Sequence, residues 1–123
     1  MSKPKINNLI NVTDVVESNI CVSSESGDKL YFVISSILRE GVSVTLSFRG
    51  IDDLTLTPAF LSSAIGLLYN GEFTDEEVDN NLDFINISIA DMTLVESTID
   101  RAKRFFKDPS VFELALDNLL FNS

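Results

Sequence analysis

The sequence has no histidine, no tryptophan and a single cysteine, Cys21. Without histidine the chain cannot form a Ser-His-Asp or Cys-His catalytic site, and it offers no imidazole to a metal ion. One cysteine cannot form a disulfide within the chain, and structural zinc requires several thiolates. No remaining side chain type supplies a general base near neutral pH. We therefore expect a protein that is not an enzyme and that carries no cofactor and no metal.

Long apolar runs and positive charge are also scarce. No stretch approaches the roughly 18–20 apolar residues of a membrane span, and the N-terminal segment lacks the apolar centre of a signal peptide. The chain has 9 basic and 19 acidic side chains and a formal net charge of −10. Such a chain is repelled by phosphate backbones. We expect a soluble, cytoplasmic protein that binds neither membranes nor nucleic acid.

The residues that are present fit one α/β domain. The chain has 123 residues, 45% of them hydrophobic, which suffices for a single core. Strand-forming residues fill positions 8–24. A helix is predicted from about Asp28, as its N-cap, to Glu40, with Gly41 at its end. The alternation of apolar and polar residues over positions 42–48 predicts the clearest strand.

Two local signals predict helix starts in the middle of the chain. Thr57 and Pro58 place a hydroxyl at the N-cap and a proline at the first helical position of a helix that ends near Tyr69. Thr74 and Glu77 have the spacing of a capping box, which predicts a second, short helix. Both helices are therefore expected to begin at a threonine.

The last third of the chain continues the alternation of strands and helices. A strand is predicted over residues 83–89, a helix capped by Asp91 follows, and a last helix spans about residues 109–121. Strands that alternate with helices predict an α/β layer fold with a partly parallel sheet. We expect a single domain with its core over about residues 8–106 and the last helix as an addition.

Three segments carry a family pattern. Residues 44–51 read VTLSFRGI, residues 56–61 read LTPAFL and residues 64–69 read AIGLLY. Positions in the second half fit the same pattern: Leu82, Phe84, Asn86, Asp91, Leu94, Ile99 and Ala102. Over roughly residues 27–106 the chain resembles the STAS-like family of small bacterial proteins of unknown function, which is similar to the STAS domains of anti-sigma factor antagonists.

The resemblance implies a mixed sheet of four to five strands with helices packed mainly on one face. It also implies a regulatory protein–protein interaction module, with a GHKL-type ATPase or kinase as partner. In the antagonists this kinase phosphorylates a serine at the start of the helix after the central strand. That position falls at Ala59, which has no hydroxyl, so this switch is excluded there. We interpret the nearest hydroxyl, Thr57, as a structural N-cap, with its phosphorylation as the alternative.

By this resemblance the partner binds the loop and helix start from Arg49 to Ser63. The candidate partner-binding residues are Asp52, Asp53, Thr57, Pro58, Ala59, Ser62 and Ser63. The same carboxylates, Asp52 and Asp53, could bind Mg²⁺ together with Asp28 or Asp91, but their spacing matches no known metal loop. We interpret them as solvated loop residues.

A cluster of acidic residues suggests a second class of function. It consists of Glu72, Asp75, Glu76, Glu77, Asp79 and Asp83. Electrostatics at a helix N-terminus explain most of the cluster. Its density also suits a stand-alone acidic inhibitor or antitoxin-like protein that binds a basic partner, and steep weakening of binding by salt would distinguish this alternative.

Apolar residues cover most sides of the predicted last helix. A helix of this kind is normally buried on more than one side. We predict that it contacts a second copy of the chain in a homodimer, with packing onto its own sheet as the alternative. The predicted contact residues are Phe112, Leu116, Leu119 and Leu120.

Overall fold

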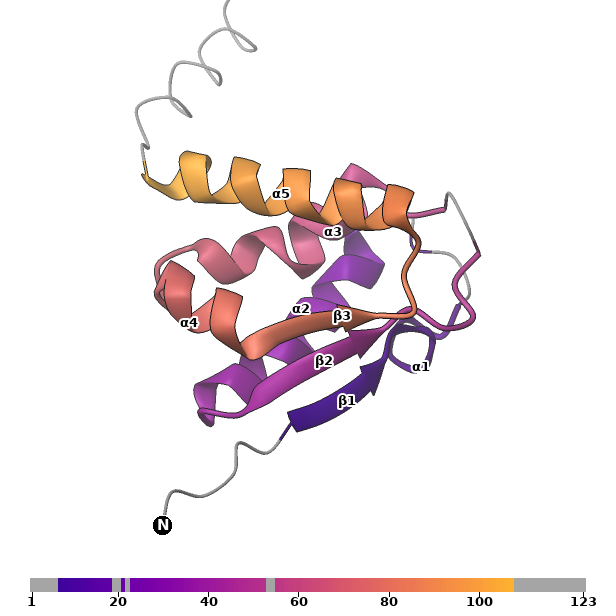
Figure 1. Cartoon of the computed structure of the whole chain (residues 1–123), viewed down its shortest axis with the longest axis horizontal. Coiled ribbons are helices and arrows are strands. Elements are labelled where there is room, and N and C mark those ends of the chain that lie inside the picture. Colours follow the sequence, from indigo (N-terminus) through magenta and orange to yellow (C-terminus); the bar gives the residue numbers. More distant parts are fainter. Residues whose placement is uncertain (1–6, 19–20, 22, 53–54, 108–123) are drawn as a thin grey trace, which may run out of the picture.

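Helices and parallel strands alternate along the chain (Figure 1). The computed structural model describes residues 7–18, 21, 23–52 and 55–107. The elements are β1 (Asn7–Asn11), α1 (Val12–Val16), α2 (Ser24–Arg39), β2 (Ser43–Ser47), α3 (Pro58–Ala64), the 3₁₀ helix η1 (Gly66–Tyr69), α4 (Asp75–Asn81), β3 (Leu82–Ile85) and α5 (Ile89–Lys107). An α/β fold was predicted, and the structure confirms it.

The sheet has the order β1-β2-β3, and both pairings are parallel. Val44 of β2 aligns with Asn8 on one side and with Leu82 on the other. Within the described residues the sheet therefore has three strands, and the mixed sheet of four to five strands is not confirmed. The physical reason is the connectivity. Helices separate each pair of successive strands and return the chain to the same end of the sheet, so no described connection is a hairpin.

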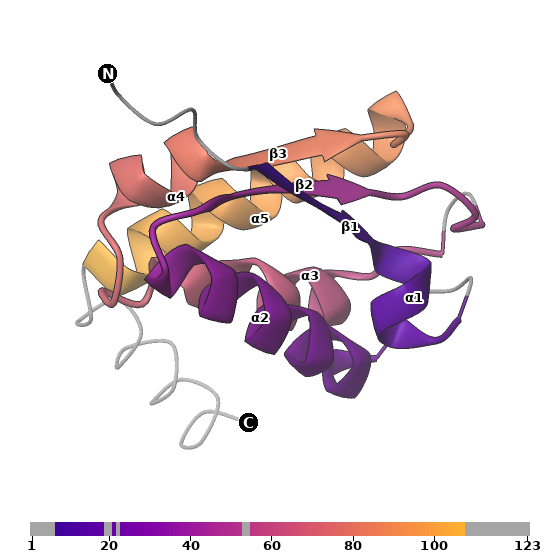
Figure 2. The same ribbon diagram turned by 90° about the horizontal axis from the view of Figure 1, so that it is seen from below.

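The core fills the space between the sheet and the helices α2 and α3. In Figure 2 these two helices lie on the same side of the strands. The core-facing side of β2 and the residue after it contributes Val44, Leu46 and Phe48, all buried. The other face of the sheet is more open, because its edge-strand residues Leu9 and Ile85 are 58% and 41% exposed.

The prediction of strand structure over residues 8–24 is only partly correct. β1 ends at Asn11, and the valines that follow form the short helix α1. Val12 and Val16 lie about one helical turn apart on one face of α1, and both are buried in the core. Cys21 is buried, but it lies outside the described strands.

The start of α2 also differs from the prediction. Ser23, and not Asp28, is the N-cap, and its hydroxyl accepts a hydrogen bond from the Ser26 N–H at 3.1 Å. Asp28 lies inside the helix and is exposed. The helix does end as predicted, because Gly41 follows it with φ of 74°.

The strand predicted over residues 83–89 is shorter in the structure. β3 ends at Ile85 because Asn86 has φ of 55°, which turns the chain out of the extended conformation. The hydroxyl of Ser88 accepts a hydrogen bond from the Asp91 N–H at 3.1 Å, and α5 begins at Ile89. Ser88 therefore takes the capping role that was predicted for Asp91.

Candidate protein-interaction surface

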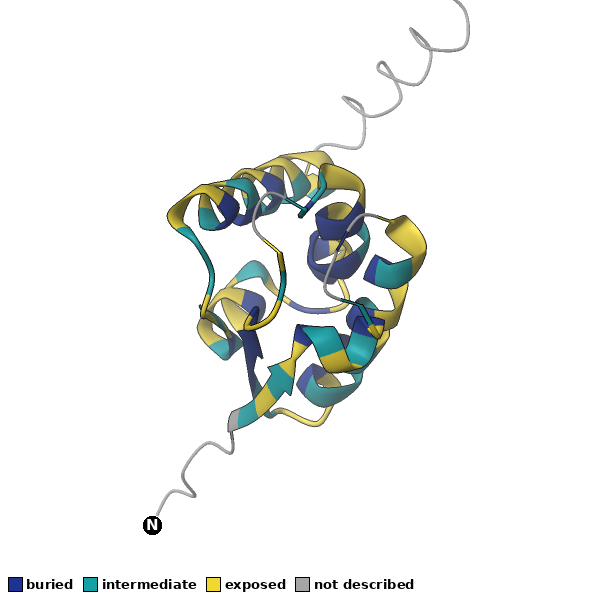
Figure 3. Cartoon of the chain, turned by 90° about the vertical axis from the view of Figure 1, so that its right-hand side faces the viewer, coloured by how far each residue is buried: buried dark blue, intermediate teal, exposed yellow. Residues whose placement is uncertain are grey.

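The predicted partner-binding segment begins at the carboxyl edge of the sheet, which Figure 3 faces. At this edge the Asn86 side-chain amide donates a hydrogen bond to the Ser47 hydroxyl at 2.9 Å, joining the ends of β2 and β3. The loop after β2 then turns at Gly50, whose φ is 86°. In open α/β sheets, ligands bind at the carboxyl ends of the strands. The segment therefore leaves the sheet where binding sites commonly form.

The start of α3 is fixed by backbone and side-chain contacts. The Thr57 hydroxyl accepts a hydrogen bond from the Phe60 N–H at 3.2 Å, which confirms the predicted N-cap. Pro58 occupies the first turn, as predicted. The Thr57 N–H donates to the Cys21 carbonyl at 3.1 Å and links α3 to the segment before α2. The first turn of α3 is thereby tied to the core.

The predicted partner-binding residues of α3 lie mainly on its exposed side. Pro58, Ala59 and Ser62 are exposed, and Ser63 is half-buried. Because positions i and i+4 of a helix share a face, Pro58 and Ser62 present one continuous surface. In contrast, the next two residues after Ala59, Phe60 and Leu61, are fully buried. Pro58, Ala59 and Ser62 therefore lie together on the exposed side of α3, and the opposite side of the helix is buried.

Of the two predicted aspartates of the loop, only Asp52 belongs to the described residues. Asp52 is exposed, and its carbonyl accepts a hydrogen bond from the Thr55 hydroxyl at 2.7 Å. Asp53 lies outside the described residues. Over the part of the chain that the structure covers, no group of three or more cysteine and acidic side chains has a metal-binding arrangement. The idea of a Mg²⁺ site at Asp52 therefore gains no support from Asp28 or Asp91.

Asp91 instead lies beside Cys21 in the interior. It is only 4% exposed, and its Oδ1 atom has no hydrogen-bond partner. Its position in the first turn of α5 places the carboxylate at the positive end of the helix dipole. Burial, and to a lesser extent the charge of Asp91, raise the pKa of the Cys21 thiol to about 11. The thiol is therefore protonated at neutral pH and is a poor nucleophile.

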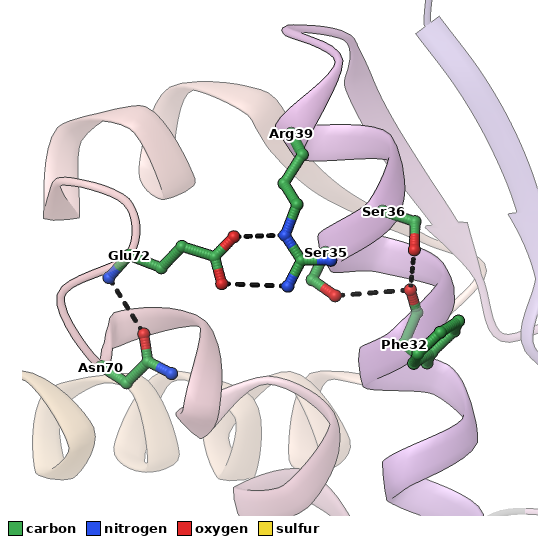
Figure 4. A network of polar contacts seen from close by, with 6 residues as sticks. All are labelled: Phe32, Ser35, Ser36, Arg39, Asn70 and Glu72. Atoms are coloured by element: carbon green, nitrogen blue, oxygen red, sulfur yellow. Dashed lines mark hydrogen bonds and ion pairs between the residues drawn. The ribbon is translucent and has the colours of Figure 1, made fainter.

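Three of the six residues of the acidic cluster, Glu72, Glu77 and Asp79, have side-chain partners. The Thr74 hydroxyl accepts from the Glu77 N–H at 3.1 Å, and the Glu77 carboxylate accepts from the Thr74 N–H at 3.3 Å, which confirms the capping box. Glu72 pairs with Arg39 of α2 (Figure 4), whose Nη2 donates to Oε1 at 3.0 Å. This hydrogen bond lowers the pKa of Glu72.

Asp79 has two partners that the sequence did not predict. The Tyr69 hydroxyl donates to Asp79 Oδ1 at 2.7 Å, and Lys103 Nζ donates to Oδ2 at 2.6 Å. The ammonium of Lys103 also lies 5.5 Å from the centre of the Tyr69 ring. The three residues come from η1, α4 and α5, so no local sequence signal reveals their contact.

The predicted dimer contacts cannot be placed. Phe112, Leu116, Leu119 and Leu120 lie outside the described residues. The prediction of a homodimer through the last helix therefore stays a prediction.

The described residues form a small α/β fold in which the start of α3 is exposed. Within the described ranges, none of the helices is long and apolar enough for a membrane span. The sequence model of a STAS-like domain of unknown function matches residues 26–92, more than half of the chain. The protein belongs to this family, as its central motifs predicted. No curated protein and no solved structure matches the chain.

Proposed function

We propose that the protein is a cytoplasmic, non-catalytic module that regulates a partner protein by binding it through the start of α3. The observation that carries this proposal is the exposed set of Pro58, Ala59 and Ser62 on a helix whose opposite side is buried. Because the Thr57 cap and the core hold this turn in place, binding would cost little conformational entropy. The proposal also includes the loop after β2, where Arg49, Gly50 and Asp52 are exposed.

The proposed partner is a GHKL-type ATPase, by analogy with the anti-sigma factor antagonists that the family resembles. Function is carried by sites and not by folds, so this step rests on analogy. Ala59 stands where the antagonists carry the phosphorylated serine, and it offers no acceptor oxygen. Binding in this protein is therefore not switched by phosphate at Ala59. Phosphorylation of Thr57 would instead place a dianion at the N-terminus of α3.

Isothermal titration calorimetry tests this proposal. The purified full-length chain is titrated with the GHKL-type ATPase encoded nearest to its gene. Ala59→Arg should abolish binding because it places a long charged side chain in the centre of the surface. Ser97→Arg is the matched control, because Ser97 is exposed and lies on α5 and not on α3. Equal affinities for the two variants, or no binding by the unmodified protein, would contradict the proposal.

A further inference from the structure

A groove of about 320 Å³ lies between the edge strand β3 and the helix α5. Its deepest lining residues, Val78 and Leu82, are buried. Its walls are Phe84 from β3 and Met92 and Ile99 from α5, and these three side chains are half-buried. The groove therefore presents apolar surface from three different elements to solvent.

The groove exists because α5 packs elsewhere. The main contacts of α5 are with η1 and α3. Gly66 of η1 faces Ala102 of α5, and a β-carbon at Gly66 would lie at the ordinary contact distance of 3.7 Å from Ala102 Cβ. β3 pairs only with β2 among the described strands, so its outer side has no neighbouring strand. The groove consequently opens beside a free sheet edge.

The rim of the groove is acidic. Asp79 of α4 and Asp83 of β3 line it, and both are exposed. Asp79 is held in place by Tyr69 and Lys103, as described above. Asp83 forms no ion pair with any residue in the described ranges, and no lysine or arginine lines the groove. The negative charge at the rim is thus only partly neutralised.

We propose that this groove binds a partner protein segment in which a large apolar side chain is flanked by lysine or arginine. The apolar side chain fills the space between Phe84, Met92 and Ile99, where burial of apolar surface stabilises the complex. The flanking cations lie against Asp79 and Asp83. Because this surface differs from the start of α3, the inference goes beyond the function proposed above.

Charge argues for a basic segment over the other possible occupants. A second copy of this chain carries the same net charge of −10 and would bring carboxylates to a rim of carboxylates. An acidic segment meets the same repulsion. A neutral apolar segment would leave Asp83 without a partner.

Phage display of random 12-residue peptides on the immobilised full-length chain tests this inference. We expect enrichment of peptides that combine a large apolar residue with an adjacent lysine or arginine. The enriched peptides are then synthesised. Met92→Lys should lower the affinity of the protein for them at least about tenfold, because it places a charge in the apolar wall of the groove. The matched control, Ser97→Lys, adds the same charge on the exposed side of α5 and should retain binding.

Circular dichroism shows whether Met92→Lys disturbs the fold. If it does, a second variant tests the groove. Asp83 is exposed, so Asp83→Asn leaves the core intact. This variant should lower the affinity for the peptides about two- to fivefold, which is the effect of losing one exposed ion pair. Ala59→Arg should bind them normally, which separates this groove from the α3 surface. Absence of enrichment, enrichment without basic residues, or unchanged binding by both groove variants would overturn the inference.

Discussion

Gly27 of α2 lies against the backbone of Phe60 in α3, and a β-carbon at Gly27 would stand 2.5 Å from the Phe60 carbonyl oxygen. The same β-carbon would lie 2.8 Å from Ser63 Cβ. Neither neighbour is the end of a flexible side chain. The two helices can therefore approach this closely only because position 27 has no side chain. The position of α3, and with it the proposed binding surface, depends on this glycine.

Gly27→Ala should lower the free energy of unfolding by about 1–3 kcal/mol, the usual cost of an overpacked site. The higher helix propensity of alanine offsets up to about 1 kcal/mol of this loss. Urea unfolding measures the change. Gly66→Ala is the control, because its β-carbon would lie 3.7 Å or more from its neighbours. Equal stability of the two variants would mean that α2 and α3 are farther apart than described.

Thr57→Ala should lower the free energy of unfolding by about 1 kcal/mol, because it removes the oxygen that accepts from the Phe60 N–H. Thr57→Ser keeps that oxygen and should be nearly neutral. Thermal unfolding of both variants compares them directly. If Thr57→Ala melted at the temperature of the unmodified protein, the hydroxyl would not act as a cap, and a functional role for it would gain support.

Cys21 should react slowly with thiol reagents in the folded protein. Its side chain is fully buried, and burial is the larger of the two causes that raise its pKa to about 11. At pH 8 labelling by a disulfide reagent should be far slower than in urea, and because the chain has one cysteine the signal needs no assignment. Labelling at the same rate with and without urea would show that the thiol is accessible.

The raised pKa of the Cys21 thiol also predicts how the stability of the protein depends on pH. The pKa of the thiol in the folded state lies above its ordinary value of 9.0. The protonated thiol therefore contributes stability that is fully present below pH 9 and is lost as the pH rises toward 11.

Tyr69 should add a second loss of stability in alkali. Burial, followed by the hydrogen bond to Asp79, raises the pKa of its phenol above the ordinary value of 10.0. The neutral phenol thus contributes stability that is present below pH 10 and declines as the pH rises further. Urea unfolding at several pH values should show a flatter decline above pH 10 for Tyr69→Phe than for Tyr31→Phe. Parallel curves for the two variants would contradict the role of Tyr69.

The features that the sequence predicted correctly depend on neighbouring residues. The caps at Thr57 and Thr74 bond to backbone groups three residues away, so the sequence spacing alone reveals them. The alternation over residues 42–48 likewise predicted β2, because one face of that strand is buried against the helices.

The sequence predictions that differ from the structure involve contacts between distant segments. Valine favours strands, yet Val12 and Val16 lie in the helix α1, where both are buried in the core. Asp28 has the chemistry of an N-cap, but α2 begins earlier, at Ser24 after the N-cap Ser23, and Gly27 packs on α3 within its first turn. The preference of valine for strands and that of aspartate for N-caps therefore did not determine the structure at these positions.

The groove beside β3 could not have been predicted from the chain alone. The apolar residues Val95 and Ile99 have the spacing of a helix with one inward face. They do not indicate which element receives that face, and in the structure α5 packs mainly on η1 and α3. The groove beside β3 remains open because α5 packs on η1 and α3 instead.

The parallel sheet also has a consequence for the order of events during folding. Asn8 pairs with Val44, and Val44 pairs with Leu82, so each strand pairing joins segments that at least one helix separates in the chain. In the described part of the molecule no pairing can form from a local turn, and such non-local topologies fold slowly. As the chain leaves the ribosome, β1 emerges first and has no partner until α2 and β2 have followed. We therefore expect the docking of α2 to set the folding rate, with β1 open to mispairing until then.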